Sequence, residues 1–408
     1  AAAVLAAAGV VPLEAVRSAV FLGELGLDGR VRRVRGVLPA LVEGRRTGLI
    51  RAVVPAAQLG EAGLVEGVEV AGVSSLIDLV ALLRGEPYPQ PEPARPRASD
   101  PGRVKDLADV VGQHEARHAL EVAAAGGHHL SLTGPPGVGK TLLAERLPGL
   151  LPDLTIEEAL QVSAIHSLAG RSLDGGLIVR PPYADPHHSA SRAALVGGGS
   201  LVAVPGAVSR AHLGVLFLDE APEFSSGALE GLRTPLEEGH IVLMRAKAAV
   251  TYPARFQLVL ASNPCPCGWY NVRDHASKCS CPPQAIRRYT TRLSGPILDR
   301  IDLHVTLHPL RSAFLKKLAT SPGESSAVVA ERVLEARLRQ RHRLAEFGYS
   351  RNVEVPGPVL RQQLRPAGGL DEVEQAVARG LLSARGVDKV LRFAWTLADL
   401  SGRARPAA

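Results

Sequence analysis

The sequence predicts an α/β fold: a parallel sheet covered by helices, with a helical region after it and a smaller α/β module before it. Between residues 104 and 310, apolar strands alternate with helical segments, which is typical of a parallel sheet. After residue 310 the pattern becomes helical and poor in glycine. Before residue 86, short strands are separated by glycines, and "LDGRVRRV" predicts a hairpin that turns at Asp28 and Gly29.

The domain boundaries follow from a proline-rich stretch. Residues 86–103 contain six prolines, and proline fixes φ and removes a backbone donor, so a semi-rigid linker is predicted. We therefore expect an N-terminal module over residues 1–85, a core over 104–310 and a small helical bundle over 311–408.

The charge of the chain is uneven. Of the 408 residues, 46% are hydrophobic and 21% are charged, and the formal net charge is +7. Residues 311–408 alone carry 17 Lys or Arg and 10 Asp or Glu, which accounts for the whole excess. This basic region permits contact with nucleic acid, although a solvated helical surface explains the same composition.

The composition does not favour a membrane protein or a secreted protein. No apolar run reaches 18 residues, and the apolar N-terminus lacks the basic region of a secretory signal. The four cysteines form one cluster rather than a scattered disulfide framework, which indicates the cytoplasm. Because the first residue is not Met, we expect the chain to begin inside an interrupted helix.

The strongest chemical signal is "GPPGVGKT", which matches the pattern G-x-x-x-x-G-K-[ST] between an apolar strand and a helix. Its glycines let the loop curl, so that backbone N–H groups and the positive end of the helix face a phosphate. Lys140 is expected to reach the β- and γ-phosphates of ATP, and the Thr141 hydroxyl to bind Mg²⁺. The candidate nucleotide-binding residues of this loop are Gly134, Pro135, Pro136, Gly137, Val138, Gly139, Lys140 and Thr141.

Two later strands end in polar side chains. "GVLFLDE" ends in Asp219 and Glu220, and "FQLVLASN" ends in Asn263. Ligands of open α/β sheets bind at the carboxyl ends of the strands, so these side chains are expected over the phosphate loop. We expect Asp219 to hold Mg²⁺, Glu220 to polarise the attacking water, and Asn263 to orient that water near the γ-phosphate.

Five stretches together resemble the magnesium-chelatase-like AAA+ ATPases of the ComM/YifB group. They are "GPPGVGKT", "GVLFLDE", "SNPCPCG", "LSGPILDRIDLHV" and "LSARGVDKVLRFAWTLADLSG", and "PHHSASRAALVGGGS" resembles a further stretch of that family. The resemblance implies an AAA+ P-loop core with a helical lid of the magnesium-chelatase C-terminal type. It also implies that Val111, Gly112 and Gln113 line the adenine pocket and that Asn263 is the first nucleotide sensor.

The resemblance further implies a ring. Arg300 resembles the arginine finger that reaches the γ-phosphate of a neighbouring subunit, and Arg385 resembles the second sensor on the lid. A finger supplied by a neighbour implies a homo-hexamer. For both arginines, the alternative is a surface salt bridge.

The function implied is ATP hydrolysis coupled to translocation or branch migration on single-stranded or branched DNA, in natural transformation and recombination. "EEGHIVLMRAKAAVTYPARF" resembles the hairpin that faces the pore of related helicases, which makes Arg245 and Lys247 candidate DNA-phosphate contacts. An ordinary solvated hairpin tip is the alternative for these two residues. The alternative function is a magnesium-chelatase-like motor subunit that remodels a protein partner.

The N-terminal module resembles part of the C-terminal domain of Lon-type proteases. Leu38 stands where those proteases have a catalytic lysine. A leucine cannot accept the proton of a nucleophilic hydroxyl, so we expect a partial, non-proteolytic module and disfavour an ATP-dependent protease.

All four cysteines lie within "SNPCPCGWYNVRDHASKCSCPP", as Cys265, Cys267, Cys279 and Cys281. Four thiolates match a structural Zn²⁺, with His275 as a substitute for one of them, although the C-x-C spacing is tighter than in common zinc sites. A redox pair and turn residues without a ligand are the alternatives. We interpret the segment as a clasp on a loop between two nucleotide-sensing residues.

Overall fold

The computed structural model divides the chain into two compact units. It describes residues 1–91, 105–173, 175–199, 203–244, 249–272, 278–293, 295–309 and 323–407. The first unit comprises Ala1–Gly102, Leu154–Val179 and Ser200–Pro205, and the second comprises Arg103–Asp153, Arg180–Gly199 and Gly206–Ala408. Residues 154–179, which the sequence boundaries assign to the core, therefore group with the N-terminal module.

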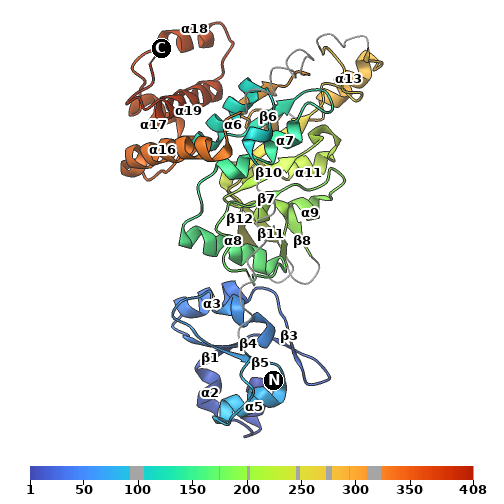
Figure 1. Ribbon diagram of the computed structural model, residues 1–408, viewed down its shortest axis with the longest axis vertical. Coiled ribbons are helices and arrows are strands. Elements are labelled where there is room, and N and C mark those ends of the chain that lie inside the picture. Colours follow the sequence, from blue (N-terminus) through green and yellow to red (C-terminus); the bar gives the residue numbers. More distant parts are fainter. Residues whose placement is uncertain are drawn as a thin grey trace. The chain divides into compact units, whose positions relative to one another are not determined.

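The second unit contains a five-stranded parallel sheet, as predicted (Figure 1). The strand order is β14, β6, β13, β10, β7. The strands span Leu130–Thr133 (β6), Tyr183–Ala184 (β7), Val215–Leu218 (β10), Gln257–Ser262 (β13) and Leu303–Thr306 (β14). This order places β13 between β6, which leads into the phosphate loop, and β10, which leads into the acidic pair.

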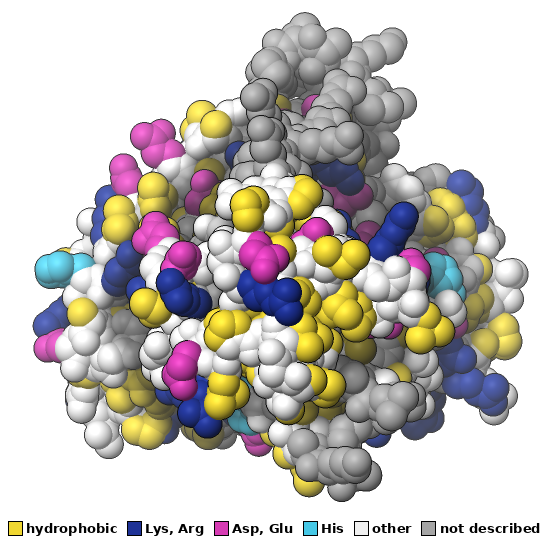
Figure 2. All heavy atoms as spheres, turned by 90° about the horizontal axis from the view of Figure 1, so that it is seen from below, with side chains coloured by type: hydrophobic (Ala, Val, Ile, Leu, Met, Phe, Trp, Pro, Cys, Tyr) yellow, Lys and Arg dark blue, Asp and Glu magenta, His cyan; other side chains and the backbone are white. Residues whose placement is uncertain are grey.

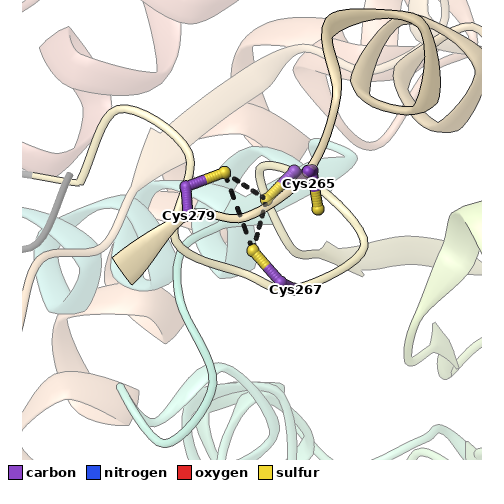
Figure 3. A group of neighbouring side chains, drawn as sticks. Cys265, Cys267 and Cys279 are labelled. Atoms are coloured by element: carbon purple, nitrogen blue, oxygen red, sulfur yellow. Dashed lines mark hydrogen bonds between the residues drawn. The ribbon is translucent and has the colours of Figure 1, made fainter. Parts of the chain in front are cut away.

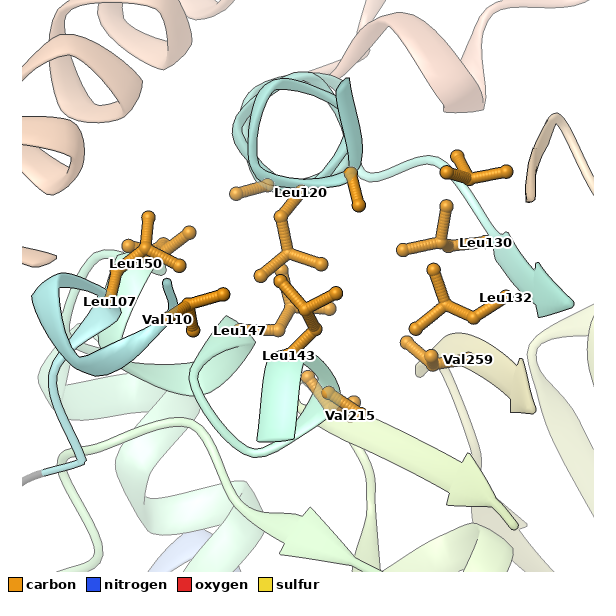
Figure 4. Close-up of a cluster of buried hydrophobic side chains, with 14 of the residues drawn as sticks. Leu107, Val110, Leu120, Leu130, Leu132, Leu143, Leu147, Leu150, Val215 and Val259 are labelled. Atoms are coloured by element: carbon orange, nitrogen blue, oxygen red, sulfur yellow. The ribbon is translucent and has the colours of Figure 1, made fainter. Parts of the chain in front are cut away.

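Both faces of this sheet are buried. Odd-numbered side chains of β10 join one hydrophobic cluster and even-numbered ones join another, as expected for a strand covered on both sides. Figure 4 shows the first cluster, to which helices α6 (His114–Gly126) and α7 (Lys140–Ala144) contribute leucines. Each fully buried leucine contributes roughly 2 kcal/mol, so the packing fixes the strand before the phosphate loop and the helix after it.

The C-terminal part of this unit is helical, which confirms the prediction. Its helices are α16 (Ser326–Leu344), α17 (Gly357–Gln362), α18 (Leu370–Ala378) and α19 (Ala384–Leu400). Ser325 and Ser383 cap α16 and α19 by accepting a backbone N–H at the third helical position. Helices α16 and α19 pack against each other and against α6. Residues 323–407 are called the lid below.

Shorter elements complete the second unit. An antiparallel hairpin pairs β11 (His240–Met244) with β12 (Ala249–Pro253). The other elements are α9 (Arg192–Val196), β8 (Gly197–Gly198), α10 (Ala207–Arg210), α11 (Ser226–Glu230), α12 (Arg233–Glu238), α13 (Pro283–Thr290) and α14 (Gly295–Leu298).

The first unit has a three-stranded parallel sheet of order β1, β4, β5. The predicted hairpin is confirmed, because β2 (Glu24–Leu25) pairs antiparallel with β3 (Val31–Arg32) on either side of Asp28 and Gly29. The other elements are α1 (Ala2–Ala7), α2 (Leu13–Arg17), β1 (Ala19–Phe21), α3 (Val37–Arg46), β4 (Arg51–Pro55), α4 (Leu59–Ala62), β5 (Glu69–Val73), α5 (Leu76–Arg84), α8 (Ile156–Leu168) and β9 (Val204–Pro205).

Helix α8 packs on α3 in this first unit, and its Ser167 hydroxyl donates to the buried Glu61 carboxylate. A buried carboxylate needs such partners, because an unpaired one is costly. The contact explains why residues 154–179 group with the N-terminal module. In the described part of the chain, none of the helices is long and apolar enough to cross a membrane.

Candidate functional site

The phosphate loop lies between β6 and α7, as the sequence predicts. Gly137 and Gly139 have φ of 77° and 94°, in the left-handed region that glycine adopts without strain. A side chain at Gly134 would lie 2.7 Å from the Leu307 carbonyl oxygen, so this position also requires glycine. The loop is therefore curled tightly over the end of the sheet.

Lys140 connects the loop to the neighbouring strand. Its Nζ donates to the carbonyl oxygens of Gly134 at 2.6 Å and Pro135 at 2.9 Å, and to Oδ1 of Asn263 at 2.9 Å. Burial lowers the pKa of Lys140, while the nearby Asp219 and Glu220 act to raise it. The structure thus brings together the lysine and the polar group that the sequence predicts at the end of the next strand.

The acidic pair follows β10 at the same edge of the sheet. Thr141 Oγ1 donates to Oδ2 of Asp219 at 2.8 Å, which joins the two expected Mg²⁺ ligands. Glu220 has a φ of 49°, a left-handed backbone that is uncommon for a residue with a side chain. Such strain concentrates at functional sites. A hydroxyl and a carboxylate oxygen in contact form a donor set that suits Mg²⁺.

The segment expected in the adenine pocket also lies beside the loop. Gln113 donates through Nε2 to the carbonyl oxygens of Val138, at 3.3 Å, and His308, at 2.9 Å. Gly112 is buried, with a φ of 65°, and Val111 is 38% exposed. The contact of Gln113 with Val138 joins this segment to the phosphate loop, and Val111 presents an exposed apolar side chain two residues before it.

Arg300 and Arg385 lie near each other. Neither takes part in the phosphate-loop contacts described above. Arg300 follows α14, pairs with Glu237, donates to the Pro296 carbonyl oxygen, and is only 13% exposed. Burial lowers the pKa of Arg300, and the neighbouring Arg385 and Arg233 lower it further. Arg385 lies in the first turn of α19 and is exposed. Arg385 is therefore open to a ligand as it stands, whereas Arg300 is largely covered and would have to move to reach one.

The two strands of the predicted hairpin are present. β11 pairs antiparallel with β12, with Ile241 opposite Tyr252 and Met244 opposite Ala249. The tip with the two candidate DNA contacts, Arg245 and Lys247, lies outside the described residues. His275, the proposed substitute for a cysteine ligand, also lies outside them.

The four cysteines converge, and Figure 3 shows three of them, Cys265, Cys267 and Cys279. Cys265 Sγ lies 3.4 Å from Cys267 Sγ and 3.8 Å from Cys279 Sγ, and all four sulfurs lie within 4.8 Å of one another. Zinc bound tetrahedrally at about 2.3 Å requires sulfurs roughly 3.8 Å apart. A backbone hydrogen bond from Trp269 lowers the pKa of Cys267 to about 6. The thiols are free of disulfides and fit a zinc site.

The cysteine turn packs on the phosphate loop, a contact that the sequence analysis missed. Gly268, with a φ of 84°, lies so close to Pro136 that a Cβ there would overlap the proline ring. The C-x-C spacing carries no signal of this contact, because it depends on how the turn folds back from β13.

His188, in "PHHSASR", is a further site residue that the sequence did not predict. Its Nδ1 lies 3.1 Å from Oε2 of Glu220. The strand order supplies the reason, because β7 lies beside β10 and leads into this stretch.

Comparisons with known proteins identify the family of the chain. The family model described as "Magnesium chelatase, subunit ChlI" matches residues 106–315, and that of its C-terminal part matches residues 323–408. The chain belongs to the magnesium-chelatase ChlI family. A further family model, "Subunit ChlI of Mg-chelatase", matches residues 1–58.

Relatives within this ChlI family cover most of the chain. An uncharacterised protein of Mycobacterium tuberculosis is 54% identical over 410 residues, which span 100% of this chain and 80% of that protein. YifB of Escherichia coli is 41% identical, over 93% of this chain and 73% of its own length. Competence protein ComM of Haemophilus influenzae is 40% identical, over 94% of this chain and 74% of its own length.

Proposed function

We propose that this chain is a ring-forming AAA+ ATPase that couples ATP hydrolysis to translocation or branch migration on DNA. The observation that carries the ATPase activity is the convergence of Lys140, Thr141, Asp219 and Asn263 at one edge of a parallel sheet. The phosphate loop and its helix N-terminus bind the β- and γ-phosphates. Membership of the ChlI family supports this reading.

Each side chain then has a defined task. Thr141 and Asp219 would hold Mg²⁺, which neutralises phosphate charge when bound. Lys140 exchanges its contacts with the loop carbonyls for the phosphates. Glu220 accepts a proton from the attacking water, and Asn263 orients that water.

The trans-acting arginine is the second part of the proposal. Arg300 pairs with Glu237 within the chain, so the γ-phosphate of a neighbouring subunit would compete with Glu237 for the guanidinium. Arg385, from the lid, is close enough to affect the pKa of Arg300, so both respond to the same interface. A homo-hexamer with a nucleotide between subunits satisfies both roles.

DNA is the proposed partner because of the hairpin and the basic lid. Arg245 and Lys247 stand in the sequence between β11 and β12, and residues 311–408 hold the whole net positive charge. The face in Figure 2 mixes basic, acidic and apolar side chains, which does not favour that face for DNA contact. The ComM relative is named a competence protein, which favours a role in natural transformation.

The alternative is a chelatase-like motor that remodels a protein partner, which the family models favour equally at the level of the ATPase core. A protease is disfavoured by Leu38. That side chain is fully buried in the hydrophobic core of the first unit, where a catalytic amine has no access to substrate.

We infer that the cysteine cluster holds a structural Zn²⁺ in a cytoplasmic protein. The spacing of the sulfurs supports this, and zinc would clasp the turn that packs on Pro136. Elemental analysis of the purified protein is expected to give about one zinc per chain, and a value near zero would remove the metal from the proposal.

The deciding experiment measures ATP hydrolysis alone, with single-stranded DNA and with a branched junction, and follows junction migration. We expect DNA to stimulate hydrolysis and the junction to migrate. Replacing Arg245 and Lys247 with alanine should reduce the stimulation, while Arg46→Ala, a solvated arginine of the first unit, should not. ATPase activity without stimulation or migration contradicts the DNA function, and stimulation by a protein partner alone favours the alternative.

A further inference from the structure

The two adjacent carboxylates of the acidic pair have different partners. Asp219 accepts from Thr141, whereas Glu220 contacts His188, whose Nδ1 lies 3.1 Å from its Oε2. The sheet explains the second contact. Tyr183 and Ala184 of β7 pair in parallel with the first half of β10, so the residues after β7 cross the same edge as Glu220.

The His188 ring is itself held in place by its neighbour. The Nδ1 of His187 accepts the Ser189 backbone N–H at 3.3 Å and contacts the Ser189 hydroxyl at 2.8 Å. The two imidazole rings lie 4.1 Å apart, at 34° to each other. Ser191 then caps α9 by accepting the Ala194 N–H. The turn between β7 and α9 thus fixes the imidazole that faces the acidic pair.

The backbone of Glu220 is also fixed, but its side chain is not enclosed. The residue adopts a left-handed conformation, and its N–H donates to Oδ1 of Asp219 at 2.9 Å. The Glu220 side chain is 51% exposed and that of His188 is 36% exposed. A half-exposed glutamate samples several rotamers, and only some of them aim its carboxylate at a given point. A contact between one of its oxygens and a fixed ring would select among them.

We propose that His188 is a positioning residue for Glu220: its Nδ1–H holds one carboxylate oxygen, so that the other faces the attacking water. The inference rests on the proposed ATP hydrolysis. Selecting one rotamer from several is worth about tenfold in rate. Exposed ion pairs add little to folding stability, so the effect of His188 should be on turnover rather than on stability.

Three substitutions test the proposal on the full chain. His188→Ala should lower kcat for ATP about tenfold and leave KM for ATP unchanged, because His188 does not contact the phosphate loop in the proposed role. His188→Asn carries its amide N–H near the position of Nδ1, so it should restore most of the rate. His188→Gln carries its amide near Nε2 and should restore little. His118→Ala, which removes an exposed histidine next to Glu121, is the matched control and should leave both constants unchanged.

The outcomes separate the two proposals. A wild-type protein without ATP hydrolysis overturns the proposed function and this inference with it. An active wild type whose rate is unchanged or raised by His188→Ala overturns the inference alone. A rise in KM without loss of kcat, or rescue by Gln rather than Asn, also contradicts the positioning role.

Discussion

The two edges of the five-stranded sheet carry polar clusters of opposite kinds. At the carboxyl edge, Glu220 is about half exposed, and the polar groups contact one another through side chains that a ligand can displace. At the amino edge, His128 and Asp302 are buried, and the His129 backbone N–H donates to Asp302 at 3.0 Å. The polar groups at the carboxyl edge are therefore exposed enough to change partners, whereas those at the amino edge are buried and stay paired.

The buried cluster continues into the lid. Nε2 of His128 lies 2.8 Å from the Thr396 hydroxyl, which accepts from Asn352 at 3.1 Å. Asn352 also donates to Asp399 at 2.9 Å, and Asp399 pairs with Arg343. This chain of contacts ties the start of β6 to α16 and α19. The difference between the edges shows that β6 begins at a buried polar cluster and ends at the loop for which we propose phosphate binding.

The largest expected effect is at the carboxyl edge. Glu220→Gln removes the proposed base while keeping the shape of the side chain, so ATP turnover should fall by about 10²–10⁴. Thermal stability should not change, because the side chain is half exposed. Steady-state hydrolysis and a melting curve check this together. If Glu220→Gln kept its ATP turnover, another residue would have to be the base. A large loss of stability would contradict the proposed difference between the two edges.

At the amino edge, Asp302→Asn should reduce stability rather than chemistry. Burial alone would raise the pKa of Asp302, but His128 and His129 lower it to about 2, against about 3.9 when unfolded. The difference corresponds to about 2 kcal/mol of stability, present above pH 4 and lost as the pH falls towards 2. Denaturant unfolding at pH 7 and pH 3 measures it.

The control for this variant is Asp299→Asn, at an exposed carboxylate nearby in the chain. It should leave both the stability and its acid dependence unchanged. If Asp302→Asn lost ATPase activity per folded molecule with no loss of stability, the amino edge would be part of the chemistry and the comparison would fail.

A smaller effect is expected where the cysteine turn meets the loop. Gly268→Ala introduces a Cβ that overlaps Pro136 at a left-handed φ, which costs on the order of 1 kcal/mol. Because the overlap is with the phosphate loop, KM for ATP should rise a few-fold. Gly227→Ala, at an open helical position, is the control and should leave KM unchanged. An unchanged KM for Gly268→Ala would separate the cysteine turn from nucleotide binding.

The carboxyl edge could largely be predicted from the sequence, because its signals are local. An apolar run followed by a glycine-rich loop with Lys140 and Thr141, or by Asp219 and Glu220, predicts both the strand and the polar side chains at its end. The contacts of His188 and Gly268 could not be predicted, since they depend on strand order and on the path of a turn. The buried polar contacts around Asp302 could not be predicted either, because single buried histidines and aspartates leave no pattern in the sequence.

The organisation of the first unit shows the same limit. The proline-rich linker suggests a clean boundary, yet residues 154–179 group with the N-terminal module through Ser167 and Glu61. A pairing of residues more than a hundred positions apart leaves no periodicity that a reading of either segment could detect.

The most direct test of the central claim is the rate of ATP hydrolysis by the wild type and by Lys140→Ala, measured with Mg²⁺ at equal protein concentration. If the carboxyl edge is the ATPase site, the wild type turns over ATP and Lys140→Ala does not, while both show the same melting temperature to within a few degrees. Equal rates in the two proteins would contradict the assignment of the site.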